Sequence, residues 1–166
     1  MKELVARFAE VMRETYAVHG ELLGLSEGKK SAILDKNIAS LDGIVRKEQL
    51  LIARQKDLER RRLACVEEFS QRTGERPENI TMLVFAEHAE PEQAQDLRAL
   101  AEKLMETLNK LRKSNDINNK MIQGRLEFIN CMIDSISSLQ ETSVYSAKGL
   151  EAGRGGKAAK LYDKKV

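Results

Sequence analysis

The chain has 166 residues, enough for one domain and rarely for two. Charged residues make up 33% of it and aromatic residues only 4%, Trp is absent and Pro occurs twice, which indicates long helices and excludes a sheet-rich fold. The formal net charge of +2 gives no bulk electrostatic reason to expect a nucleic-acid partner.

The N-terminal third carries an apolar seam that alternates in steps of four and three, the spacing of coiled coils. Val5, Met12 and His19 widen the seam on one side, which suits a bundle better than a two-stranded coil. Asp35 is expected to cap a second helix. The seam residues are Leu4, Phe8, Val11, Thr15, Val18, Leu22 and Leu25.

A second helix is predicted from about residue 36 to 72, with two apolar edges. Polar residues at Glu48, Gln55 and Arg62 interrupt both edges, so its middle is expected to be less deeply buried or to make polar contacts. Gly74 and Pro77 form a stop signal just beyond it.

Residues 75–90 connect the long helices, and the apolar run Ile80–Phe85 predicts a short helix that closes one end of a bundle. Pro91 suits the first turn of a third long helix. Together these patterns predict an all-α fold, an elongated antiparallel coiled-coil helical bundle of about three long helices with a short connecting helix.

The third helix follows a heptad seam and is the longest, about 50 residues or 75 Å. Asn115 and Asn118 occupy seam positions where leucine would be more stable, so these amides are expected either to fix the register of the bundle or to belong to a groove that accepts another helix. Beyond them the apolar stripe is broad, and the third helix is longer than the helices expected to pack against it. This surplus is a candidate binding face.

Residues 143–166 contain six basic and two acidic residues and too few apolar ones to order themselves, so they are expected to form a flexible basic tail after a helical domain of residues 1–142. Cys65 and Cys131 are expected as buried or half-buried thiols rather than a disulfide. With no signal-like or membrane-spanning segment, a cytoplasmic location and no membrane insertion are expected.

Catalytic groups are scarce. His19 and His88 are the only histidines, and neither has a Cys or His at metal-ligand spacing. No glycine-rich phosphate loop follows a strand. Arg60, Arg61 and Arg62 point about 100° apart on a helix and form no single basic face. We therefore expect no enzyme, no cofactor, no metal site and no nucleic-acid partner.

Two segments resemble the FlgN family of flagellar export chaperones. One lies in the second helix, with Leu41, then residues 45–51 (Val-Arg-Lys-Glu-Gln-Leu-Leu), then residues 58–61 (Leu-Glu-Arg-Arg). The other combines the two seam asparagines with the apolar stripe of the third helix and a closing Tyr145 near Gly149. The resemblance covers most of residues 1–150, with Ser146 where the family commonly has glycine.

The resemblance implies a cytoplasmic chaperone that binds the C-terminal amphipathic helices of hook-associated (hook–filament junction) proteins. It would prevent their premature assembly and deliver them to the export gate of the flagellar type III system. The residues expected to contact the partner are Leu111, Asn115, Asn118, Ile122, Leu126, Ile129, Met132, Ile133, Ile136 and Tyr145.

Two alternatives remain open from the sequence. One is a structural coiled-coil protein, such as a homodimer or another homo-oligomer in which the surplus of the third helix pairs with itself. The other is a helical secretion chaperone with a different client. Solution mass and client binding distinguish these alternatives from the first interpretation.

Overall fold

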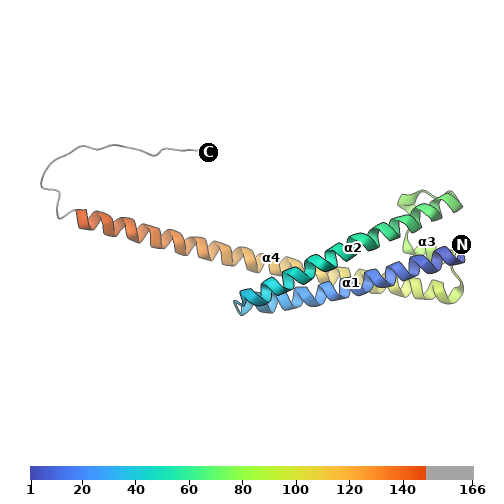
Figure 1. The fold of residues 1–166 in the computed structure, drawn as a ribbon, viewed down its shortest axis with the longest axis horizontal. Coiled ribbons are helices and arrows are strands. Elements are labelled where there is room, and N and C mark those ends of the chain that lie inside the picture. Colours follow the sequence, from blue (N-terminus) through green and yellow to red (C-terminus); the bar gives the residue numbers. More distant parts are fainter. Residues whose placement is uncertain (149–166) are drawn as a thin grey trace. The chain divides into compact units, whose positions relative to one another are not determined.

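A computed structural model describes the backbone of residues 1–148 and the side chains of residues 1–137. Over this part the chain contains helices and no strand, which confirms the predicted all-α fold (Figure 1). Most of the predicted tail, residues 149–166, lies outside the described residues. The elements are α1 (Lys2–Leu34), α2 (Ile38–Thr73), the 3-10 turn η1 (Pro77–Asn79), α3 (Met82–Glu87) and α4 (Pro91–Lys148).

The chain divides into two compact units, residues 1–122 and residues from Gln123 onward, with α4 contributing to both. In the first unit α1 and α2 are antiparallel. Arg7 near the start of α1 pairs with Glu68 near the end of α2, and Lys29 pairs with Glu48 at 2.6 Å. This agrees with the predicted antiparallel arrangement of the long helices.

The beginning of α4 runs in the same direction as α1. Lys2 pairs with Glu90, directly before α4, at 2.7 Å, and Ser26 near the other end of α1 contacts Asn115. The first unit is therefore a three-helix bundle in which α2 is antiparallel to both neighbours (Figure 1).

Heptad residues of the three helices form the core of this bundle. The seam of α1 is buried from Leu4 to Val18 and half-buried at Leu22 and Leu25, as its spacing predicts. Only the C-terminal half of α2 is deeply buried, in agreement with the polar interruptions in its middle. Its buried residues are Leu58, Cys65, Val66 and Phe69.

The turn between α1 and α2 differs from the prediction. Asp35 is not the N-cap of α2 but the C-cap of α1, and Lys36 follows it with a left-handed φ of 56°. The N-cap is Asn37, whose side-chain oxygen accepts a hydrogen bond from the Ser40 backbone N–H at 2.9 Å. Reversing the chain takes three residues, so the capping position falls two residues later than expected.

The other helix boundaries agree with their local signals. Gly74 ends α2 with φ 76°, a left-handed conformation that glycine adopts without a Cβ penalty. Pro77 opens η1 and Pro91 opens α4. The short helix α3 begins at Met82 after Thr81, whose hydroxyl accepts from the Val84 backbone N–H. The predicted connecting helix is confirmed.

Ion pairs between helices add a small, pH-dependent contribution to the stability of the bundle. The hydrogen bond from Arg61 lowers the pKa of the Glu14 carboxyl from its ordinary 4.5, and the charge of Arg54 adds to the effect. A lowered folded-state pKa contributes stability above the unfolded pKa, and this contribution is lost as the pH falls through the folded value. Glu14→Gln should therefore lower Tm slightly at neutral pH, and this difference in Tm should shrink as the pH falls below 4.5. Thermal unfolding followed by circular dichroism across this pH range checks this, and a difference in Tm that does not change with pH would contradict it.

Candidate partner-binding site

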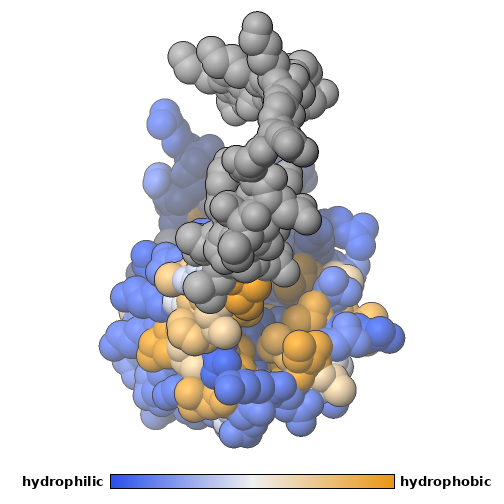
Figure 2. All heavy atoms as spheres, turned by 90° about the vertical axis from the view of Figure 1, so that its left-hand side faces the viewer, coloured by the Kyte–Doolittle hydropathy of each residue, from blue (hydrophilic) through white to orange (hydrophobic). Residues whose placement is uncertain are grey.

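Large apolar side chains remain open to solvent on α4 beyond Ile122. Between 49% and 65% of the surface of each is exposed. Figure 2 shows hydrophobic groups open to the viewer among hydrophilic ones on the face that it draws. We call the following set the α4 stripe: Leu126, Phe128, Ile129, Met132, Ile133 and Ile136.

The stripe follows helical spacing. Leu126, Ile129, Ile133 and Ile136 are separated by steps of three and four, so at about 100° per residue they lie within about 80° of one another. Met132 and Phe128 widen the stripe on one side. The predicted contact residues from Leu126 to Ile136 thus lie together on one open helix face, whereas contact with a partner stays a prediction.

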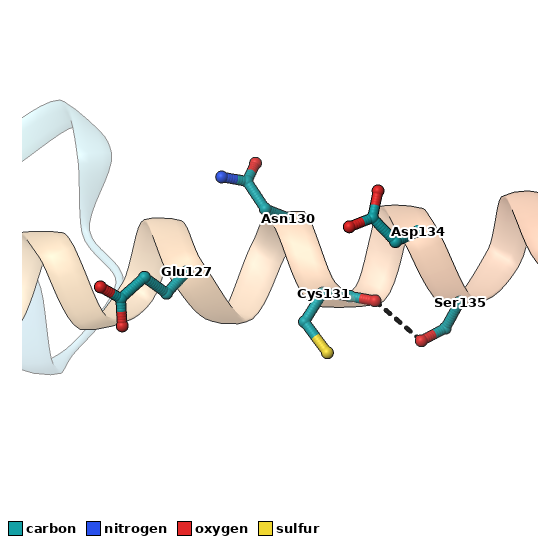
Figure 3. A pocket seen from close by; sticks show the side chains of 5 residues that line it. All are labelled: Glu127, Asn130, Cys131, Asp134 and Ser135. Atoms are coloured by element: carbon teal, nitrogen blue, oxygen red, sulfur yellow. Dashed lines mark hydrogen bonds between the residues drawn. The ribbon is translucent and has the colours of Figure 1, made fainter.

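The opposite face of this part of α4 is polar. It forms a shallow depression lined by side chains of one helix (Figure 3). Ser135 Oγ donates a hydrogen bond to the Cys131 carbonyl at 2.8 Å. Cys131 is exposed here, which corrects the prediction of a buried or half-buried thiol; Cys65 is buried as expected. The lining residues are Glu127, Asn130, Cys131, Asp134 and Ser135.

Asn118 lies inside the three-helix bundle. Its side chain is 2% exposed, and Nδ2 donates to the Ser26 carbonyl of α1 at 2.7 Å. Ser26 is fully buried, and its Oγ lies 2.8 Å from both Ser114 Oγ and Asn115 Oδ1. This polar layer joins α4 to α1 at one level of the bundle, as the register interpretation of the asparagines requires.

Asn115 is more accessible than Asn118. With Leu111 it lines a shallow groove that α1 and α2 complete within the first unit. At this groove Lys29 and Glu48 form a half-buried ion pair. Sequence analysis did not single out the contribution of Leu22 and Ile52 to the groove, although the polar interruption at Glu48 indicated that α2 packs loosely here. Ile122 is half-buried, and the Tyr145 side chain lies outside the described residues.

In both histidines the ring nitrogen Nδ1 lies near the backbone carbonyl four residues earlier in the chain. His19 Nδ1 is 2.8 Å from the Thr15 carbonyl one turn earlier, and His88 Nδ1 is 3.1 Å from the Val84 carbonyl. Over the part that the structure describes, no group of three His, Cys, Asp or Glu side chains is placed to hold a metal ion. No described helix has the length and apolar content needed to cross a bilayer.

Replacing Asn118 by leucine should stabilise the first unit by about 1–2 kcal/mol. Asn118 Oδ1 is buried without a hydrogen-bond partner among the described residues, so an apolar side chain of the same branching removes an unfavourable group and adds apolar contact. Asn119→Leu, at the exposed neighbouring position, is the matched control and should change stability by less than about 0.5 kcal/mol. Urea unfolding measures both, and a destabilised Asn118→Leu would mean that the bonds to Ser26 outweigh apolar packing.

Comparisons with known proteins identify the family of this chain. The family model described as FlgN protein matches residues 1–153. A protein of Bacillus subtilis (strain 168), described as uncharacterized protein YvyG, is 26% identical over 137 residues, covering 82% of this chain and 83% of the relative. No solved structure matches the chain. Since the family model spans the whole helical part that the structure describes, the chain belongs to the FlgN family of flagellar export chaperones.

Proposed function

We propose that this chaperone acts in the cytoplasm and binds the C-terminal amphipathic helices of hook–filament junction proteins through the α4 stripe. It keeps these clients unassembled and brings them to the flagellar export gate. The observation that carries the proposal is the open apolar face of Leu126, Ile129, Ile133 and Ile136 on a continuous helix. An exposed apolar patch of this kind marks an interaction surface.

The chemistry of the face selects its partner. Its central residues are aliphatic and uncharged, and they repeat at helical spacing, so they fit the apolar side of an amphipathic helix. Client segments that form helices in the assembled flagellum expose the same kind of apolar side before assembly. Ordering such a segment on binding consumes part of the interaction energy, and the affinity stays low enough for release at the export gate.

The two asparagines have separate parts in this proposal. The Asn118 side chain donates its hydrogen bond to Ser26, so it acts on the client indirectly, by fixing α4 against α1. Asn115 and Leu111 line the open groove of the first unit and offer an amide and an aliphatic side chain to a client.

Isothermal titration with the C-terminal segments of the two hook–filament junction proteins from the same genome tests the proposal. We expect binding near a Kd of about 1 μM, with a clearly negative heat-capacity change from burial of apolar surface. Binding without that heat-capacity change would place the client on a polar surface instead. Absence of heat with both segments at several temperatures would refute these clients.

A further inference from the structure

The α4 stripe is wider than the seam of a two-stranded coiled coil. In heptad positions a to g, Ile122, Ile129 and Ile136 occupy a, and Met132 occupies d. The stripe adds Leu126 and Ile133 at e and Phe128 at g, each about half exposed or more. From Phe128 to Leu126 the apolar arc spans about 160° at about 100° per residue.

The same helix has a narrower apolar face where two helices already cover it. In residues 91–122, which pack with α1 and α2, Leu97 and Leu104 at d are buried and Leu100 at g is half-buried. The e positions there are mostly polar and all of them are exposed. They are Pro91, Arg98, Met105, Arg112 and Asn119. Position e is therefore mostly polar up to residue 122 and apolar at Leu126 and Ile133 in the second unit, which begins at Gln123.

One partner helix cannot cover this arc. In two-stranded coils the e and g positions flank the seam and are commonly Glu or Lys, which pair across the interface in water. Here Leu126, Phe128 and Ile133 put uncharged, large apolar groups at both flanks. A single partner helix, whether from a client or from a second copy of this chain, would leave one flank in water. Two helices side by side would bury both.

We infer that the α4 stripe binds a pair of amphipathic helices, a helical hairpin, from one client. One helix packs against Leu126, Ile129 and Ile133, and the other packs against Phe128 and Met132. This rests on the proposed function and specifies the form in which the client is held: a three-helix bundle made of one chaperone helix and two client helices.

Two variants test the e flank and the g flank of the α4 stripe separately. Leu126→Asp places a charge on the e flank and Phe128→Asp places one on the g flank; both side chains are exposed, so neither variant should disturb residues 1–122. Asn130→Asp adds the same charge on the polar face and is the matched control. The probes are the C-terminal segment of one hook–filament junction protein, used whole and as two peptides cut between its helices.

We expect the whole segment to bind at least about tenfold more tightly than either peptide. Leu126→Asp should weaken one peptide by about tenfold or more and spare the other, and Phe128→Asp should do the reverse. A single peptide that binds as tightly as the whole segment and is weakened by both variants would overturn the hairpin while leaving the proposed function intact. Failure of every probe to bind would instead refute the proposed function. A client-free dimer that both variants dissociate would overturn the hairpin in favour of a second copy.

Discussion

Replacing Ile129 and Ile133 together by aspartate should reduce client affinity by more than about a hundredfold, so that titration with the C-terminal segments gives no measurable heat. Each isoleucine that a client covers contributes on the order of 1.5–3 kcal/mol of apolar burial. Each aspartate would in addition have to lose its hydration under the client helix. The two isoleucines together account for about 3–6 kcal/mol of the roughly 8 kcal/mol that a micromolar complex has, so the remaining affinity falls to a Kd of about 0.1 mM or weaker, below what the titration detects.

The fold should survive this double substitution. Ile129 and Ile133 are 49% and 55% exposed and lie outside the unit of residues 1–122, so the melting of that unit should be unchanged. A control with the same added charge, Asn130→Asp with Cys131→Asp, alters the polar face of the same turns and should bind clients normally. Binding by the Ile129/Ile133 variant equal to that of this control would move the client site off the stripe.

The helices of the fold could be predicted because their signals are local. Seam spacing from Leu4 to Val18 requires only that some apolar partner exists, and Gly74 and Pro91 act on the backbone at their own positions. The cap of α2 was assigned wrongly because Asp35 and Asn37 are both competent caps, and the geometry of the turn, not the residue type, decides between them.

The candidate site was only partly predictable. The spacing of Ile129 and Ile133 predicts one helix face, and the structure shows that face open to solvent. The same pattern cannot tell that Asn118 meets Ser26, because that contact joins residues 92 apart in the sequence. The prediction that the Cys131 thiol is buried or half-buried was wrong. Helical spacing alone places Cys131 on the side of α4 opposite the stripe, so the sequence could have assigned it to the polar face.

Replacing Phe85 of α3 by alanine should lower the free energy of unfolding of the first unit by about 3–5 kcal/mol, because Phe85 is part of an aromatic cluster. Phe85 is fully buried and stacks on Phe8 of α1 with ring centroids 3.7 Å apart, while Phe69 of α2 lies against it at 4.5 Å. One side chain of α3 thus joins two long helices. With six residues α3 is too short to be stable alone, so its position depends on this contact.

A loss of that size is a large part of the 5–15 kcal/mol by which domains are usually stable, so Phe85→Ala should unfold the first unit at much lower urea. Leu83→Ala, on the same short helix but 53% exposed, is the matched control and should shift stability by less than about 0.5 kcal/mol. Because α4 begins four residues after α3 ends, loosening α3 also frees the start of α4. The rate of backbone hydrogen exchange in Phe85→Ala should therefore rise first at residues 80–97. If Phe85→Ala and Leu83→Ala lose the same free energy of unfolding, Phe85 does not anchor α3 to the bundle.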